Sequence, residues 1–146
     1  MSRTLLVFLL VAMLLSACKS SATLSTAEAV VGQPVTIAGG AYTDVSATEL
    51  QTMLANKDFI FINVHIPFEG NIANTDLSIP YNEIDQNLEQ LPADKNAKIV
   101  LYCRSDRMSR MAAETLVSLG YTNVWNLDGG MVIWEQAGLP LEQSQP

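Results

Sequence analysis

The chain is poor in cysteine, histidine and basic residues, and each scarcity excludes a class of function. Two cysteines and one histidine among 146 residues offer no ligand set for a zinc site. Eight basic residues against fifteen acidic ones give a formal net charge of −7, which argues against nonspecific nucleic-acid binding. The length has room for one domain. We therefore expect a single domain that needs no metal or other cofactor.

The few basic residues are unevenly placed, because three of the eight lie within residues 103–110. This stretch begins with Cys103, follows an apolar run at 99–102 and leads into a periodic helix pattern. Helix N-terminal amides and nearby arginines both favour the thiolate, the reactive form of cysteine. One basic site in an acidic protein suggests a small anionic ligand. The alternative is a group of solvated arginines at a helix start.

The N-terminal residues 1–17 have the pattern of a signal peptide, with Arg3 before an apolar segment at 5–15 that is short for a transmembrane helix. The segment ends in Leu15-Ser16-Ala17-Cys18, which resembles a bacterial lipobox. We expect Cys18 to carry lipid and to hold an extracytoplasmic domain on a bacterial membrane. The alternative is an ordinary cleaved signal peptide with Cys18 incidental. If Cys18 is lipidated, Cys103 is the only free thiol.

The remaining chain divides into a predicted flexible tether at 18–33, rich in Ser, Thr and Ala, a domain at 34–142 and a tail at 143–146. Apolar runs predict strands at 42–45, 59–64, 77–80, 99–102 and 124–127, with a short extra strand at 34–37. Ser46 and Glu49 form a capping box for the first helix, and further helices are expected at 84–91, 108–119 and 131–136. This alternation predicts an α/β domain with a mainly parallel sheet.

The loop Cys103-Arg104-Ser105-Asp106-Arg107-Met108-Ser109 resembles the Cys-x-x-Gly-Arg-x-Ser loop of the rhodanese-like domains. The resemblance continues through Leu127-Asp128-Gly129-Gly130 and Gly138-Leu139-Pro140, and it covers about residues 42–140. It implies a three-layer α/β fold with a mainly parallel five-stranded sheet flanked by helices. It also implies a sulfurtransferase, in which Cys103 takes sulfane sulfur from a donor such as thiosulfate and passes it to cyanide or a thiol.

The same resemblance assigns roles to the loop. Cys103 would be catalytic and form a persulfide, backbone amides of 104–109 would cradle it, and Ser109 would hydrogen-bond the sulfur. The residues expected to bind the substrate are Arg104, Ser105, Asp106, Arg107, Met108 and Ser109. Arg110 is expected to add only long-range charge. The predicted partners of this monomer are the sulfur donor, the acceptor and, through Cys18, the membrane.

Three residues depart from the family pattern. Asp106 stands in place of a glycine, and Asp is among the few side chains that tolerate positive φ. At about 4 Å its carboxylate would oppose a thiolate by about 1 kcal/mol in water-like surroundings and about 4 kcal/mol at lower dielectric, unless it pairs with an arginine. The alternative is a solvated helix cap. Asn63 replaces an aspartate and His65 an arginine; we expect His65 to be a structural hydrogen-bonding residue rather than a catalytic one.

Two other functions compete with sulfur transfer. The substitutions at 63, 65 and 106, together with the tether, are compatible with a sulfur-carrier or binding module that hardly turns over. Phosphatase chemistry on a Cys-x5-Arg loop is disfavoured, because the sixth residue after Cys103 is Ser109 and Tyr102 precedes the cysteine.

Overall fold

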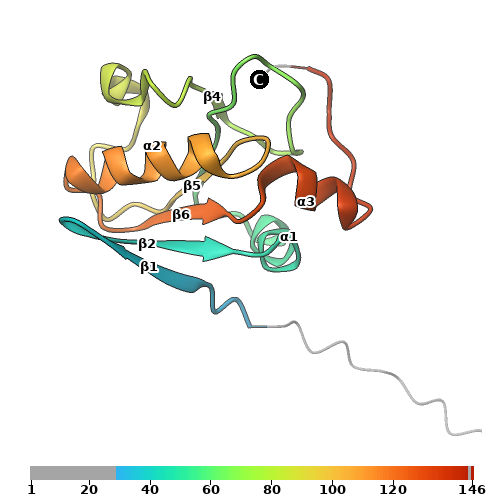
Figure 1. Ribbon diagram of the computed structural model, residues 1–146, viewed down its shortest axis with the longest axis horizontal. Coiled ribbons are helices and arrows are strands. Elements are labelled where there is room, and N and C mark those ends of the chain that lie inside the picture. Colours follow the sequence, from blue (N-terminus) through green and yellow to red (C-terminus); the bar gives the residue numbers. More distant parts are fainter. Residues whose placement is uncertain (1–28, 145) are drawn as a thin grey trace, which may run out of the picture.

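The computed structural model describes residues 29–144 and 146 (Figure 1). The predicted signal peptide, the lipidation site at Cys18 and the tether up to residue 28 lie outside the described residues. Within the described part, no helix has the length and apolar character of a membrane span.

A six-stranded sheet forms the centre of the domain, in the order β1-β2-β6-β5-β3-β4. Its strands are β1 (Gln33–Ile37), β2 (Gly40–Val45), β3 (Ile60–Asn63), β4 (Leu77–Ser78), β5 (Ile99–Tyr102) and β6 (Val124–Leu127). Every neighbouring pair is parallel except β1 and β2, which pair antiparallel around the turn at Gly39. The mainly parallel α/β fold is therefore confirmed. The sheet has a sixth strand because the short extra strand expected at 34–37 joins its edge as β1.

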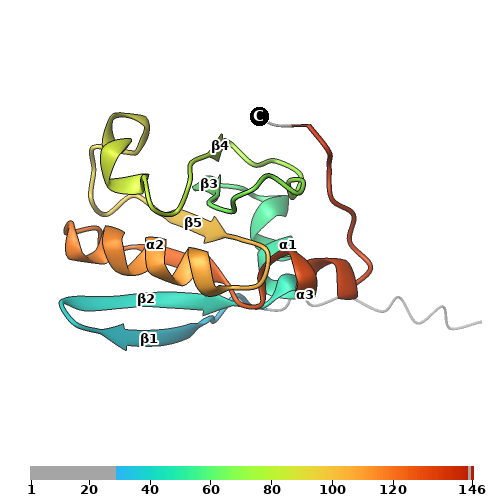
Figure 2. The ribbon, with the colours of Figure 1, turned by 45° about the horizontal axis from the view of Figure 1, so that its top comes forward.

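Helices cover both faces of this sheet (Figures 1 and 2). Helix α2 (Arg107–Ser118) packs on one face together with the 3-10 turns η1 (Ile84–Gln86) and η2 (Leu88–Gln90). Helices α1 (Ala47–Ala55) and α3 (Gly130–Gln136) cover the other. Strand residues alternate between two buried clusters, so that Leu101 faces α2 while Val100 and Tyr102 face α1 and α3. This is the three-layer arrangement expected from nearly continuous apolar strands.

The helix predicted at 84–91 is instead two separate 3-10 turns. Asn87 lies between them with φ −119° and ψ 30°, which is not helical, and its side-chain amide donates to the Glu83 carbonyl at 2.8 Å. Asparagine competes in this way with backbone hydrogen bonds, and the apolar spacing alone did not reveal it.

The capping box at the start of α1 is confirmed and also fixes the N-terminal boundary of the domain. Glu49 accepts from the Ser46 N–H at 2.9 Å, and the Ser46 hydroxyl accepts from the Glu49 N–H. The same carboxylate accepts from the N–H groups of Val31 and Gly32 at 3.2 and 2.9 Å. Residues 31–33 therefore lie against the domain, whereas the sequence placed them in the tether.

Candidate active site

Cys103 lies directly after β5, at the edge where the carboxyl ends of β2, β6, β5 and β3 gather. Ligand sites of parallel sheets form at this edge. The thiol is buried, with Cys103 only 2 % exposed. The Asp106 N–H donates to Cys103 Sγ at 3.0 Å, which places a dipole where negative charge on sulfur is stabilised. The backbone of the loop therefore donates a hydrogen bond to the sulfur.

Ser109 is the second group at the sulfur, as the resemblance implied. Its hydroxyl oxygen lies 3.4 Å from Cys103 Sγ and 2.9 Å from the Asp106 carbonyl oxygen. A hydroxyl has one proton to donate, so it bonds either the sulfur or the carbonyl at a given time. Ser109 is completely buried, so its hydroxyl bonds one of these two loop atoms rather than solvent.

Asp106 has φ 104°, so the position does require the conformation for which the family uses glycine. Although it is the N-cap residue of α2, its carboxylate makes no capping hydrogen bond. The carboxylate instead accepts from Asn126 Nδ2 at 2.8 Å and forms an ion pair with Arg110 Nε. Of the alternatives open from the sequence, pairing with an arginine is the one observed, but the partner is Arg110; the solvated cap is not observed.

Arg110 acts at short range, contrary to the long-range role expected from the sequence. Besides Asp106, its NH2 group lies 3.4 Å from Asp44 and 3.1 Å from Asp128. Burial opposes the charged guanidinium, yet the carboxylates of Asp106 and Asp44 raise the pKa of Arg110 above its ordinary value. Helical spacing brings Arg110 back over Asp106, since residues four apart lie on the same face.

Asp44 and Asn126 connect this cluster to the sheet. Asn126 Nδ2 also donates to Asp44 Oδ1 at 2.7 Å, and both residues are buried near the ends of β6 and β2. Burial raises the pKa of Asp44, while the Asn126 hydrogen bond and Arg110 act in the opposite direction. The conformation of the loop is therefore coupled to two neighbouring strands.

Arg104 is also held by carboxylates. Its Nε lies 2.9 Å from Glu69 Oε2, and its NH1 lies 3.5 Å from Glu135 Oε2. Arg107 is exposed at the first position of α2, and among the described residues it has no ion pair. Of Arg104 and Arg107, both expected to bind the substrate, Arg107 is thus the one whose charge is not already paired with a carboxylate in the described part.

The other loop residues differ in what they present. Ser105 is exposed at the rim, whereas the side chain of Met108 is partly buried against the core cluster on the α2 face. The backbone of Met108 is therefore more available for substrate binding than its side chain. The assignment of both to substrate binding stays a prediction.

Asn63 supports the loop indirectly, through a chain of buried polar groups. Its amide donates to the Gly70 carbonyl at 3.0 Å and to Asn71 Oδ1 at 2.8 Å. Asn71 Oδ1 also accepts from the Tyr102 hydroxyl at 3.0 Å, and Tyr102 directly precedes Cys103. The side-chain amide of Asn63 therefore connects the end of β3 to β5 through Asn71 and Tyr102.

His65 lies at the end of β3, and its side chain is only 10 % exposed. Its backbone N–H donates to Asn63 Oδ1 at 3.0 Å, but both ring nitrogens are buried without a hydrogen-bond partner in the described part. Nε2 lies 3.4 Å from Glu69 Oε2, an ion pair only when the ring is protonated. The ring therefore lacks the structural hydrogen bonds expected of it. The described residues contain no cluster of three or more metal-ligating side chains.

The start of α3 holds the loop from the opposite side. The Met131 N–H donates to the Cys103 carbonyl at 2.9 Å, and the Val132 N–H donates to the Arg104 carbonyl at 3.0 Å. This approach is possible because residue 130 is glycine. A Cβ there would lie 2.8 Å from the Arg104 carbonyl carbon and oxygen, and φ is +59°.

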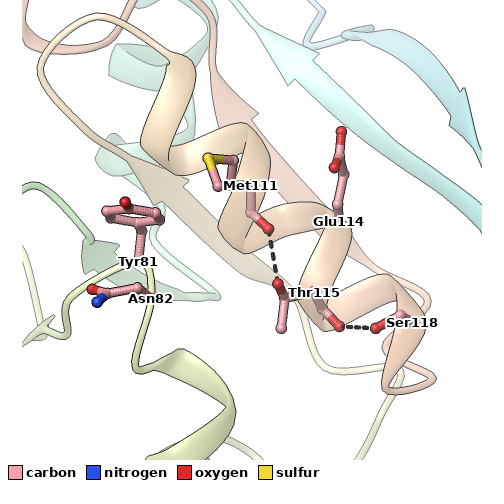
Figure 3. A pocket seen from close by; sticks show the side chains of 6 residues that line it. All are labelled: Tyr81, Asn82, Met111, Glu114, Thr115 and Ser118. Carbon is pink, nitrogen blue, oxygen red and sulfur yellow. Dashed lines mark hydrogen bonds between the residues drawn. The ribbon is translucent and has the colours of Figure 1, made fainter.

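A groove of about 390 Å³ lies between α2 and the segment after β4, apart from the thiol (Figure 3). Tyr81 and Asn82 line one side, and residues of α2 line the other. The hydroxyl of Thr115 donates to the Met111 carbonyl, and that of Ser118 donates to the Thr115 carbonyl, so both donors are occupied by the helix itself. Cys103 does not line the groove, so the groove is not part of the candidate active site.

Several residues that shape the site were given no role there by the sequence analysis: Asp44, Glu69, Asn126, Asp128, Gly130 and Glu135. Two of them carried a usable signal, because Asp44 and Asn126 are polar residues inside otherwise apolar strands. Such residues are buried only when they are paired. The glutamates carried no comparable signal.

Comparison with known proteins identifies the same region. Residues 46–137 match the family model described as "Rhodanese-like domain". A sulfurtransferase of Allochromatium vinosum is 31 % identical over 102 residues, which cover 67 % of this chain and 92 % of that protein. The protein slr1261 of Synechocystis is 33 % identical over 98 residues, 66 % of this chain and 54 % of the relative, so the chain matches about half of its length.

A solved structure shows the same fold. The rhodanese-related protein of Thermoplasma volcanium superposes with a TM-score of 0.59 at 29 % identity, covering 69 % of this chain and 98 % of that one.

Proposed function

Since the chain belongs to the rhodanese-like family of sulfurtransferases, we propose that it transfers sulfane sulfur through a persulfide on Cys103. The donor is a compound such as thiosulfate, and the acceptor is a thiol or cyanide. The observation that carries the proposal is the 3.0 Å contact from the Asp106 N–H to Cys103 Sγ, which aims a backbone dipole at the sulfur.

The proposed reaction divides one difficult transfer into two displacements at sulfur. With thiosulfate, the Cys103 thiolate attacks the outer sulfur, the S–S bond of the donor breaks, and sulfite leaves with that bond's electron pair. Cys103 then carries the outer sulfur as a persulfide. In the second step an acceptor thiolate attacks this outer sulfur, and the Cys103 thiolate is the leaving group. No net oxidant or reductant is needed.

The loop residues have separate roles in this proposal. The Asp106 amide and the Ser109 hydroxyl stabilise negative charge on the sulfur atoms, and the exposed Arg107 attracts an anionic donor. Arg104 and Arg110 keep the loop in shape through their ion pairs with carboxylates. Because Cys103 is only 2 % exposed, we expect the donor to be a small or slender group.

The test is turnover of the full chain in detergent with thiosulfate and cyanide. We expect thiocyanate to form, and we expect Cys103→Ala to abolish its formation. Cys18→Ser is the matched control, because it removes the other cysteine of the chain and leaves the loop intact. The proposal fails if Cys103→Ala retains turnover, or if the unmodified chain neither turns over nor acquires sulfur with any sulfane donor.

A second candidate is a sulfur carrier that takes up one sulfur and hardly turns over alone. The observation that favours it is the loop itself, whose thiol is buried and whose Arg104 and Arg110 are paired with carboxylates. Rapid-mixing kinetics separate the two functions. A carrier gives one equivalent of leaving group in a burst followed by negligible steady-state rate, whereas an enzyme continues at a rate that rises with acceptor concentration.

We also propose that Cys18 carries lipid and holds the domain outside the cytoplasm on a bacterial membrane. The support is the Leu15-Ser16-Ala17-Cys18 sequence after a short apolar segment. Mass spectrometry of the mature N-terminus in a bacterial host tests it. An N-terminal Cys18 that carries acyl chains is expected, and an N-terminus at another residue or an unmodified Cys18 would contradict it.

A further inference from the structure

The loop is rich in arginine along the sequence, but in the folded structure carboxylates surround two of these arginines. Arg104 and Arg110 are paired there with five carboxylates, one from the loop itself and four from other parts of the chain. These carboxylates belong to Asp44, Glu69, Asp106, Asp128 and Glu135. We call them the carboxylate collar. With all of them ionised, the region around the thiol carries an excess of negative charge.

The collar neutralises the arginines at short range. Arg110 contacts three of its members, and Arg104 contacts the other two. Arg107 is the only arginine of the loop without such a partner in the described part. Asp128 and Glu135 are 60 % and 48 % exposed, so their charge also meets an approaching solute.

Building on the proposed function, we infer that this site favours sulfane donors of low charge, such as persulfides of uncharged thiols, over the dianion thiosulfate. A donor with two negative charges is repelled by the collar, while Arg107 supplies one unmatched positive charge. A persulfide of an uncharged thiol carries at most one negative charge, so the same field opposes it less. The collar thus acts on the choice of donor and leaves the backbone cradle of the sulfur unchanged.

The preferred step is balanced without an additional reactant. The Cys103 thiolate attacks the outer sulfur of R–S–SH, a new S–S bond forms, and the S–S bond of the donor breaks. The products are the Cys103 persulfide, Cys–S–SH, and the thiolate R–S⁻, which takes the electron pair of the broken bond. The proton on the outer sulfur remains there, so charge and atoms are conserved.

The salt dependence of donor kcat/KM shows whether the charges around the site attract or repel the donor. Donor kcat/KM is measured with the full chain, using thiosulfate and the persulfide of 2-mercaptoethanol as the two donors. Because salt screens exposed charges, raising NaCl from about 20 to about 200 mM should raise thiosulfate kcat/KM by about fivefold and change the persulfide value less. A thiosulfate kcat/KM that falls with salt overturns the inference, since it shows an attractive site.

Variants separate the collar from the overall negative charge of the protein. Glu135→Gln combined with Asp128→Asn removes two exposed charges of the collar, and a chain with only Glu89→Gln serves as the remote control. Glu89 is exposed in η2, and Figure 1 shows this yellow-green segment at the end of α2 opposite the loop that precedes the helix. We expect the double variant to raise thiosulfate kcat/KM by about threefold and to reduce its salt dependence, with a smaller change for the persulfide. The Glu89→Gln chain should keep both properties of the parent.

The outcomes distinguish this inference from the proposed function. Equal effects of the double variant on both donors, or an effect equal to that of Glu89→Gln, refute the role of the collar while Cys103 still forms a persulfide. Absence of the persulfide with every donor refutes sulfur transfer itself.

Discussion

We expect Asp106→Ala to destabilise the protein more than Asp106→Gly, although alanine is the better residue in most positions. Both substitutions remove the carboxylate and so lose the contacts with Asn126 and Arg110. They differ in the backbone, because residue 106 has φ 104° and only glycine adopts that conformation without steric cost. The difference between the two variants therefore isolates backbone strain.

The expected magnitudes follow from these contacts. A non-glycine residue in a sparsely populated region of φ and ψ costs about 2 kcal/mol. Glycine loses about 0.7 kcal/mol more in chain entropy on folding, which leaves a net difference of about 1 kcal/mol in favour of Asp106→Gly. Loss of the Asn126 hydrogen bond and the half-exposed Arg110 ion pair adds about 1 to 3 kcal/mol to the destabilisation of both. Because the parent Asp106 already carries this backbone strain, Asp106→Ala should lose about 1 to 3 kcal/mol relative to the parent, and Asp106→Gly about 1 kcal/mol less than that.

Urea denaturation at neutral pH measures the free energies of unfolding. Persulfide formation on Cys103 measures whether the loop of each variant still takes up sulfur. Asp106→Gly should retain sulfur uptake, since its amide can still point at Sγ, and Asp106→Ala should lose most of it. If Asp106→Ala is as stable as Asp106→Gly and equally active, the observed φ has no energetic cost and the account of this loop is refuted.

Three further predictions concern its surroundings. Gly130→Ala places a Cβ against the backbone of Cys103 and Arg104, so we expect a loss of about 2 kcal/mol or more in urea denaturation and a weaker sulfur uptake; an unchanged variant would contradict the packing of α3 on the loop. Tyr102→Phe removes a buried hydroxyl, whose pKa burial raises to about 12, and it leaves the Ile72 N–H and Thr75 Oγ1 without this partner. It should cost about 1 to 3 kcal/mol in the same assay, whereas Tyr81→Phe should cost much less. Hydrogen bonds from the Ser46 and Gly32 backbones lower the pKa of Glu49 from 4.5 to about 2, so its stabilisation is present above pH 4.5 and is lost as the pH falls towards 2. Because the carboxylate is partly exposed, we expect the acid-dependent loss to shrink by about 1 kcal/mol in Glu49→Gln, and an identical pH profile would refute it.

The sequence was sufficient for features that depend on residues close in the chain. The capping box, the strand ending before Cys103 and the amphipathic α2 all follow from spacing. Aspartate was noted as a residue that tolerates positive φ in place of the family's glycine, and Asp106 does adopt it. Local patterns of this kind carry their own geometry, because side-chain spacing fixes which atoms meet.

The charge of the site could not be predicted in the same way. The arginines of the loop are adjacent in sequence, but Asp44, Glu69, Asp128 and Glu135 come from other elements and meet them only after the strands are ordered. Strand order and register are set by the packing of the whole sheet, and one sequence does not display them. A cluster that looked basic along the chain consequently contains more carboxylates than arginines around Arg104 and Arg110.

The most direct test of the central claim is the intact mass of the full chain after incubation with a sulfane donor and removal of excess reagent. The account predicts a gain of one sulfur atom, localised to Cys103 by peptide mapping, reversed by an acceptor thiol and absent in Cys103→Ala. A chain that gains no sulfur, or that gains it equally in Cys103→Ala, would contradict the account.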